Sequence, residues 1–272
     1  MSLSGKSEFS KVYTFYIKVF NFVLFQLLLI QKAIITPGPS KRILFSNQKQ
    51  DWVPDIHKGF RNSKHHIFFE ELNSNSTEEY DLIVPLTIQE LLSDQTRKLL
   101  INNPIPLPNL ASIDLCDDKY QFNTFLISKG FGTYVPSMEG PFDYPYIFKK
   151  KVDQFGANTH IIHGEKEEKK LAALLKSPDY FVQEIIRGNT EYATHIIFKQ
   201  GKILHSLNIK YIFHLEMGIK GKDESITRIC HCPYLEIFSA ILKSIGFEGV
   251  CCFNYKVRNN IPYIIEINPR FG

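Results

Sequence analysis

The sequence predicts a protein of mixed α/β and α+β class, in which a small parallel-sheet domain precedes a larger unit of antiparallel strands. Between residues 37 and 110, short apolar runs alternate with a helical pattern, as in strand–helix–strand units. After residue 190, successive strand-forming runs are separated by short turns, which is typical of antiparallel pairing. A length of 272 residues is sufficient for two such domains.

The composition is that of an ordinary globular protein and excludes some functional classes. Hydrophobic residues make up 44% of the chain, enough for a substantial core. The formal net charge is +4 without a long block of Lys or Arg, so we expect no nucleic-acid partner. The cysteines are scattered and lack zinc-site spacing, which favours reduced thiols in a cytoplasmic protein. They are Cys116, Cys230, Cys232, Cys251 and Cys252.

The N-terminal segment, residues 1–36, differs from the rest in its hydrophobicity. Residues 12–35 would be long enough to cross a bilayer, for which about 20 residues are needed, but Lys18 and Gln26 interrupt the run. Three interpretations stay open: a helix packed on the body or on a second subunit of a homo-oligomer, a membrane anchor within residues 11–35, or a non-native extension.

A small α/β domain is predicted at residues 37–110. Strand-forming runs occupy 42–46, 66–72 and 80–87, and a helical pattern follows at 88–100. Strands that alternate with helices imply a parallel sheet. No GxGxxG motif follows the first strand, so a dinucleotide site is not expected there. A proline-rich stretch then marks the junction with a larger domain at residues 111–272.

The elements of the larger domain follow from the same patterns. A helix is expected to begin at Asp114, a plausible cap, and to end near Gly130. Asn259 and Asn260 form the turn between the last two strands. Further helices are expected at 166–175 and 233–246, and strands at 144–149, 180–186, 192–198, 202–207, 207–213, 249–257 and 263–267.

The last strand carries the most specific pattern of the chain. Glu266 and Asn268 are two residues apart, so they project from the same face of that strand. A carboxylate and a carboxamide on one face offer the oxygen ligands that Mg²⁺ prefers. Pro269 ends the strand, and Arg270 is placed beside the metal as an anion clamp. The alternative is an edge strand with two polar residues that face water.

The segment Glu266-Ile267-Asn268-Pro269-Arg270-Phe271-Gly272 resembles the metal-binding strand of the ATP-grasp superfamily, and most of all its carbamoyl phosphate synthetase large-chain branch. The resemblance extends from Asp114 to the last residue, with five motifs in the family's order. It implies a small pre-ATP-grasp domain followed by an ATP-grasp unit of two α+β lobes that hold ATP between them.

Two lysines match the family's phosphate-binding cations. The segment at 118–136 resembles the family's opening helix, which makes Lys119 a phosphate ligand, with a helix-surface lysine as the alternative. The strand at 144–149 resembles the one that delivers the second cation, Lys149, although Lys151 lies on the same face. Residues 153–159 would form the phosphate-covering loop, and here the chain departs from the family because it has only one glycine, Gly156.

A third motif, at residues 180–192, resembles the family's adenine-binding hinge. Backbone groups of Glu184 to Ile186 would bind the adenine edge, and Glu191 would accept hydrogen bonds from the ribose hydroxyls. The alternative is a plain hairpin that turns at residues 187–189. The residues that the resemblance assigns to the nucleotide here are Gln183, Glu184, Ile185, Ile186 and Glu191.

Two further positions differ from the family. Residues 217–227 resemble a segment of the synthetase, but this chain has Lys220 where the synthetase has a histidine. A catalytic cation is therefore kept at this position, while bicarbonate becomes a doubtful substrate. Related enzymes often place an acidic metal ligand twelve residues before Glu266, and this chain has the neutral Asn254 there. The resemblance therefore assigns Glu266, Asn268 and Asn254 to the metal, and Arg270 and Lys220 to catalysis.

The resemblance implies an ATP- and Mg²⁺-dependent ligase, in which Mn²⁺ could replace Mg²⁺. A small-molecule carboxylate would attack ATP to form an acyl phosphate, which a small-molecule amine would capture. The alternative is a degenerate ATP-grasp protein that binds nucleotide without turnover, as a regulatory or membrane-tethered partner. The loop with only Gly156 and the neutral Asn254 favour this alternative.

Overall fold

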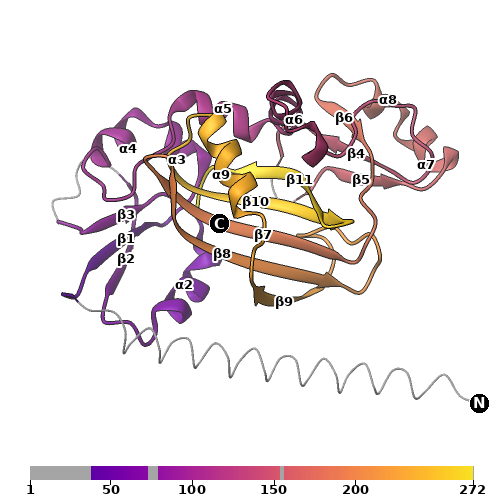
Figure 1. The fold of residues 1–272 in the computed structure, drawn as a ribbon. Coiled ribbons are helices and arrows are strands. Elements are labelled where there is room, and N and C mark those ends of the chain that lie inside the picture. The colour runs from indigo at the N-terminus through magenta and orange to yellow at the C-terminus, as the bar shows by residue number, and fades with distance from the viewer. Residues whose placement is uncertain (1–37, 73–78, 154–155, 272) are drawn as a thin grey trace, which may run out of the picture. The chain divides into compact units, whose positions relative to one another are not determined.

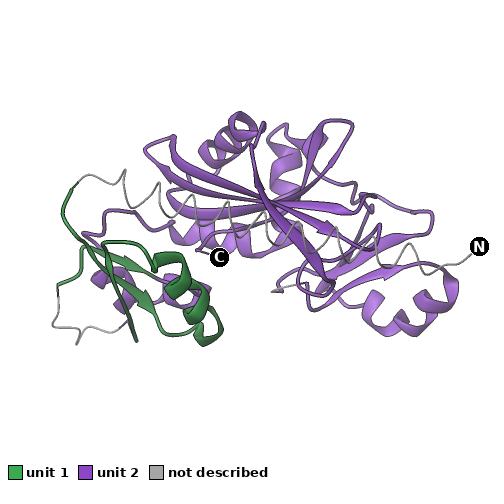
Figure 2. Ribbon diagram, turned by 90° about the horizontal axis from the view of Figure 1, so that it is seen from below, with its two compact units in different colours: residues 1–71, 76–84 green, residues 72–75, 85–272 purple. Residues whose placement is uncertain are grey.

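The computed structural model describes residues 38–72, 79–153 and 156–271. Residues 1–36, where a hydrophobic segment is predicted, lie outside the described residues, as does Gly272. Two compact units are distinguished in Figure 2, and the chain passes into the second one after Val84. The domain boundary expected at residue 110 stays a prediction. Across the described part of the chain, no helix has both the length and the apolar character needed to span a membrane.

The first unit contains a parallel sheet of three strands in the order β2-β1-β3. The strands are β1 (Arg42–Ser46), β2 (His66–Glu70) and β3 (Leu82–Val84), with α2 (Val53–Phe60) and the short η1 (Gln50–Trp52) between the first two. The centre of β1 is buried, as expected for the middle strand of a parallel sheet. The predicted α/β class of this part is confirmed.

The helix expected at 88–100 is in fact two short helices, α3 (Ile88–Leu92) and α4 (Asp94–Leu99). The separating residue, Ser93, has an extended backbone, and its hydroxyl accepts a hydrogen bond from the N–H of Thr96. Ser93 therefore acts as the N-cap of α4, a local hydrogen bond that a pattern of apolar spacing does not reveal.

The helix expected to begin at Asp114 also proves to be two helices, α5 (Leu110–Asp117) and α6 (Lys119–Ser128). Asp114 lies inside α5 and is not a cap. The cap is Asp118, whose carboxylate accepts the N–H groups of the second and third residues of α6. This break makes Lys119 the first residue of α6. A 3-10 turn, η2 (Gly132–Tyr134), follows.

A small antiparallel sheet in the order β5-β4-β6 follows in the second unit. Its strands are β4 (Tyr146–Lys150), β5 (Thr159–Ile162) and β6 (Tyr180–Gln183), and two short helices, α7 (Glu165–Lys170) and α8 (Ala172–Leu175), replace the single helix expected at 166–175. Tyr146, Phe148 and Ile162 form its core on one face. Lys149 therefore projects from the opposite face of β4.

The large sheet is antiparallel, with the strand order β11-β10-β7-β8-β9 (Figure 1). The strands expected at 202–207 and 207–213 are one continuous strand, and the sequence patterns did not predict β9. The turn at Asn259 and Asn260 is confirmed, with positive φ at both residues. The strands are β7 (Thr190–Lys199), β8 (Lys202–Phe213), β9 (Ser225–Cys230), β10 (Gly249–Arg258) and β11 (Ile261–Asn268).

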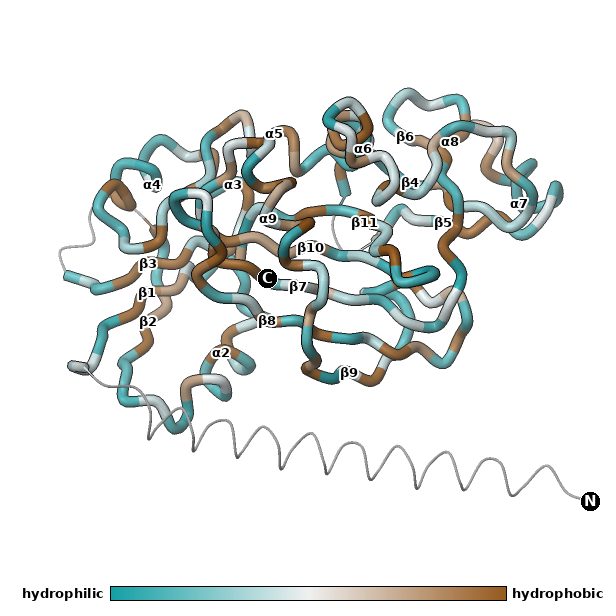
Figure 3. Tube along the Cα trace, viewed as in Figure 1, coloured by the Kyte–Doolittle hydropathy of each residue, from teal (hydrophilic) through white to brown (hydrophobic). Residues whose placement is uncertain are grey.

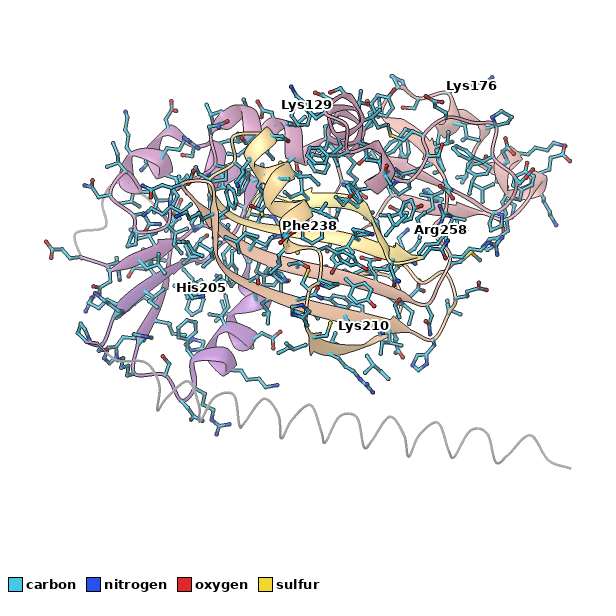
Figure 4. The ribbon with its side chains drawn as sticks, in the orientation of Figure 1. Lys129, Lys176, His205, Lys210, Phe238 and Arg258 are labelled. Atoms are coloured by element: carbon cyan, nitrogen blue, oxygen red, sulfur yellow. The ribbon has the colours of Figure 1, made fainter. Side chains whose placement is uncertain are left out.

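Helix α9 (Leu235–Ser244) covers one face of this sheet with the apolar side chains of Phe238, Ile241 and Leu242. They pack against residues of β7, β10 and β11, among them the fully buried Phe253. Figure 4 labels Phe238 on its helix, and Figure 3 shows the hydropathy along these elements. The other face of β7, β10 and β11 carries polar and charged side chains, so the sheet separates a hydrophobic core from the candidate site.

Candidate functional site

The polar face of the large sheet is centred on a bulge in β11. Asn254 pairs with Glu266, but the next residue, Tyr255, pairs with Ile264. Ile265 therefore has no residue opposite it on β10. Ile264 and Ile267 can therefore both face the core although they are three residues apart. Glu266 and Asn268 share the opposite face, as predicted from their spacing, and the amide of Asn268 donates to Glu266 Oε1 over 3.2 Å.

Glu266 is the centre of the site. Its Oε2 lies 3.3 Å from the ammonium of Lys119, and its Oε1 accepts a 2.7 Å hydrogen bond from Asn254 Nδ2. Burial alone would raise the pKa of Glu266, but Lys119, Asn254 and the nearby Lys149 outweigh it and hold the pKa at about 2. The carboxylate is therefore charged at every pH at which the protein would work.

Lys119 reaches Glu266 because the break at Asp118 starts a new helix at this point. Its ammonium is buried and also donates to the carbonyl of Asp153 over 2.6 Å. A lysine held by two acceptors in the interior does not fit the helix-surface alternative. Asp117, two residues earlier, lines the same small hollow as Lys119 and Glu266. The sequence patterns did not single out Asp117, although its neighbour Lys119 was assigned to the site.

Arg270 lines this hollow too, together with Asn268. The guanidinium is buried, with burial lowering its pKa, and it donates to the carbonyl of Phe271 over 3.0 Å. The structure places Arg270 in the same hollow as Glu266 and Asn268, and its role as an anion clamp stays a prediction. The hollow thus combines two cationic side chains, Lys119 and Arg270, with the carboxylates of Asp117 and Glu266.

Lys149 approaches Glu266 from the small sheet. It is 2% exposed, its Nζ lies 3.4 Å from the carbonyl oxygen of Ile265, and it lies over the ring of Phe181. Burial, reinforced by the charge of Lys119, lowers the pKa of Lys149 to about 7. Lys149, rather than Lys151, is therefore the lysine that faces the site, and its charge can change near neutral pH.

Lys220 and Asn254 extend the cluster across β10. The ammonium of Lys220 donates to Asn254 Oδ1 over 2.8 Å and lies 4.8 Å from the centre of the Tyr211 ring. Asn254 is thus placed between Lys220 and Glu266, with a hydrogen bond to each. The oxygen that would have served as a metal ligand is occupied by the ammonium, so coordination by Asn254 would require its carboxamide to turn.

Part of the predicted phosphate-covering loop adjoins the segment that carries Lys220. Gly156 has a positive φ, and a Cβ there would lie 3.1 Å from a methyl group of Ile219. The ammonium of Lys222 donates to the carbonyl of Thr159 over 2.7 Å. The single glycine of the loop is therefore used for a close approach between two chain segments.

The hinge connects two different sheets. Its first strand, β6, pairs with β4 in the small sheet, whereas β7 pairs with β8 and β10 in the large one. This excludes a plain hairpin at residues 187–189. The buried Gln183 donates to the carbonyl of Pro136, and the N–H of Glu184 donates to Ser137. Ile185 and Ile186 are buried.

The side chain of Glu184 makes a contact that is separate from the adenine binding expected of its backbone. Its carboxylate forms an ion pair with Arg258, whose guanidinium lies 4.5 Å from the centre of the Tyr263 ring. This contact connects the hinge with the β10–β11 hairpin. The N–H of Glu184 is already bound to the carbonyl of Ser137, so this N–H is not available to an adenine edge.

Glu191 follows the hinge on β7 and is 7% exposed. Burial raises its pKa to about 7, against the opposing effects of Lys220 and Lys256. Lys256 was missed from the sequence, although it alternates with Asn254 and therefore shares its face of β10. It is buried and donates to the carbonyl of Gly188 over 3.2 Å.

Comparison with known proteins supports the class that this geometry suggests. Residues 116–272 match the ATP-grasp domain family, and the chain belongs to that family. No curated protein sequence matches the chain. The similarity to solved structures extends further, because it includes most of the residues before the family match.

Three ligases illustrate the structural similarity. D-alanine–D-alanine ligase from Bacillus anthracis has a TM-score of 0.57 at 17% identity, with 85% of this chain and 87% of that chain covered. L-amino acid ligase from Bacillus licheniformis has 0.57 at 14% identity, covering 87% and 68%. Phosphoribosylamine–glycine ligase from Thermotoga maritima has 0.58 at 15% identity, covering 85% and 69%. The predicted fold class is confirmed.

The residues around Glu266 fit a divalent cation that takes most of its ligands from phosphate and water. Glu266 provides a permanently charged oxygen and Asn268 a carboxamide. Within residues 38–72, 79–153 and 156–271, no three His, Cys, Asp or Glu side chains form a metal-binding group. Burial raises the pKa of the nearby Cys252 to about 12, so this thiol is not an anionic ligand. Such a donor set suits Mg²⁺ shared with phosphate and water.

Proposed function

We propose that this protein is an ATP- and Mg²⁺-dependent ligase that joins a carboxylate to an amine through an acyl-phosphate intermediate. Family membership and the three similar ligases support this class of reaction. The observation that carries the proposal is the convergence of Lys119 and Lys149, both buried, on the carboxylate of Glu266. Together with Arg270, these two lysines outnumber the carboxylates of Glu266 and Asp117, and this excess of positive charge favours a polyphosphate ligand.

The nucleotide would extend from the hinge to this cluster. The carbonyl of Glu184 and the N–H of Ile186 would bind the adenine edge, which offers a donor and an acceptor. Glu191 would accept hydrogen bonds from the ribose. A structure of the Bacillus anthracis ligase complexed with ATP, at a TM-score of 0.54 and 16% identity, supports a nucleotide site in this fold.

Glu266 and Asn268 would hold the cation, for which Mn²⁺ could replace Mg²⁺. The ion would neutralise charge on the phosphate oxygens during transfer. Lys119 and Lys149 would fix the phosphates in position, and Arg270 would stabilise the charge that develops on the transferred group. The buried setting strengthens each of these charge contacts and excludes competing water.

In the chemical step, an oxygen of the substrate carboxylate would bond to the γ-phosphorus while the bond to ADP breaks. The amine nitrogen would then attack the acyl carbon and phosphate would leave, with one proton lost from the amine. Lys220 would stabilise the anionic acyl phosphate. The likeness of residues 217–227 to the carbamoyl phosphate synthetase large chain supports that branch as the finer assignment, with a substrate other than bicarbonate.

A trapping assay tests the proposal. The protein is incubated with ATP, Mg²⁺, hydroxylamine and a pool of carboxylates, and ADP and hydroxamate are measured. Carboxylate-dependent ADP release with matching hydroxamate is expected, and Glu266→Gln should abolish both. Nucleotide binding without either product, across a pool that includes amino acids, would overturn the ligase proposal in favour of a nucleotide-binding protein without turnover.

The setting of this activity is a separate part of the proposal. The substrates would be a small-molecule carboxylate and a small-molecule amine, which are cytoplasmic metabolites as a class, so we propose a cytoplasmic protein. Membrane association through residues 11–35 and assembly into a homo-oligomer are the two arrangements that the hydrophobic N-terminal sequence supports.

A further inference from the structure

We propose that the site uses a single divalent cation and that the ammonium of Lys220, held by Asn254, replaces a second one. This inference rests on the proposed function and specifies its metal requirement. Phosphoryl-transfer sites often hold two metal ions about 3.5–4 Å apart, bridged by shared ligands. In this chain, the position directly across from Glu266 is occupied by a lysine–asparagine pair.

The orientation of the Asn254 carboxamide is fixed by its two partners. An ammonium group can only donate, so Lys220 must face the oxygen of Asn254, at 2.8 Å. A carboxylate can only accept, so Glu266 must face its nitrogen, at 2.7 Å. If the carboxamide were turned, both contacts would become repulsive. Asn254 therefore directs its nitrogen, which is no metal ligand, toward the site of the cation.

On the β10–β11 pair, the side chains that share the face of Glu266 do not supply a second anionic ligand. The other carboxylates near Glu266, Asp117 of α5 and Glu191 of β7, lie outside this strand pair. Glu266 shares its face with the carboxamides of Asn254 and Asn268 and with the thiol of Cys252, which pairs with Asn268 across the strands. None of these three is a carboxylate. Along β7, the residue opposite Asn254 is Ala193, which has no ligand atom. One carboxylate can hold one cation together with phosphate and water.

The charges of the two arrangements are equal. A divalent cation with one carboxylate ligand adds a net charge of +1 to the site, since +2 and −1 are combined. Lys220 with the neutral Asn254 also adds +1. The lysine–asparagine pair can thus provide the same electrostatic stabilisation to a phosphate without a second ion, and the two substitutions relative to the family make sense as a coupled change.

Counting the bound metal tests this inference without any measurement of activity. The intact protein is saturated with a non-hydrolysable ATP analogue and titrated with Mn²⁺, and bound Mn²⁺ is followed by electron paramagnetic resonance. We expect one Mn²⁺ per bound nucleotide. The double variant Lys220→Ala, Asn254→Asp removes the ammonium and adds a carboxylate, and it should bind two, with the line broadening of a close spin pair.

The matched control is Lys210→Ala, which removes a lysine on β8 that is labelled in Figure 4. Lys210 lies over the ring of Tyr192, a residue that packs against the hydrophobic core on the face of the sheet away from the site. This variant should keep one Mn²⁺ and the wild-type affinity for the analogue. Lys220→Ala alone should also keep one Mn²⁺ while it weakens analogue binding about tenfold, the effect of one charge-assisted contact.

Two Mn²⁺ ions on the wild-type complex would overturn the inference, and this measurement needs no variant that could fail to fold. A folded double variant that binds only one ion would overturn it as well. A wild-type protein that binds the analogue and two ions leaves the ligase proposal standing. A protein that does not bind the analogue by calorimetry would instead refute the proposed function, on which the inference depends.

Discussion

Replacing Glu266 by glutamine is the most informative single change, because it keeps the shape of the side chain and removes its charge. The pKa of this carboxyl falls from its usual 4.5 to about 2 in the folded protein. At about 1.4 kcal/mol for each pH unit, this difference corresponds to about 3 kcal/mol of stabilisation at neutral pH. In Glu266→Gln, the buried Lys119 and Lys149 would lose their common counter-charge.

At pH 7, a loss of about 3 kcal/mol should lower the melting temperature of the second unit by about 6–12 °C, at the 2–4 °C per kcal/mol typical of this size. The pH dependence has a definite sign. Because the folded pKa is below the unfolded one, the stabilisation by Glu266 is complete above pH 4.5 and is lost as the pH falls toward 2. The wild-type protein and the variant should therefore converge in acid.

The effect of Glu266→Gln on the binding of metal-free ATP should be opposite to its effect on stability. The variant site is more positive than the wild-type site, so ATP without Mg²⁺ should bind to Glu266→Gln at least as tightly as to wild type and should restore part of the lost melting temperature. Turnover should be abolished, because the charged metal ligand is gone. Calorimetry and thermal unfolding with and without ATP measure these effects.

The control for this prediction is Glu236→Gln, on the exposed first turn of α9. It should change the melting temperature by less than about 1 °C, since an isolated surface charge contributes little. If Glu266→Gln melts like wild type at pH 7 and keeps its Mg²⁺-dependent turnover, Glu266 is a structural residue and the site has been assigned incorrectly.

Three further predictions concern other parts of the chain. Lys149→Ala should weaken ATP binding at least about tenfold, whereas Lys150→Ala, on the other face of β4, should not. The pKa of Lys149 is lowered to about 7, and a bound phosphate would raise it. ATP binding at pH 8 should therefore be accompanied by proton uptake in wild type but not in Lys149→Ala. Calorimetry in buffers of different ionisation enthalpy measures this uptake. Deleting residues 1–35 should leave cooperative unfolding of the remainder, and a non-cooperative transition would show that the segment belongs to the core. Gly249→Ala should destabilise the protein by about 2 kcal/mol or more, because the residue has φ +106° and a Cβ there would lie 2.6 Å from a backbone oxygen. Gly246→Ala, where φ is positive but a Cβ would meet open space, should destabilise it less, as measured by urea unfolding.

Elements whose signals are local could be predicted from the amino-acid sequence. The apolar run at 42–46 is the buried centre of a parallel sheet, and the pair Asn259 and Asn260 forms the turn of the last hairpin. The two-residue spacing of Glu266 and Asn268 placed both on one face. Each of these features depends on backbone preferences or side-chain period within a few residues, so it can be read from a single segment.

Local signals were insufficient where short-range hydrogen bonds competed with periodicity. The long helices expected at 88–100 and after Asp114 were each divided by a capping side chain, Ser93 and Asp118 respectively. Strand β9 was not predicted, because its pattern is mixed and its place at the edge of the sheet depends on pairing with β8. Apolar spacing does not record either effect.

The candidate site required the tertiary structure. Family motifs placed Lys119, Lys149, Lys220 and Glu266 in one site, but not the contacts among them, since these residues come from α6, β4, a loop and β11. The bulge at Ile265 and the register of β10 decide which atoms meet, including the placement of Asn254 between an ammonium and a carboxylate. Such contacts join residues far apart in sequence. For β10 and β11, packing against α9 fixes which face is buried, and the small sheet fixes the face of β4 through its own core.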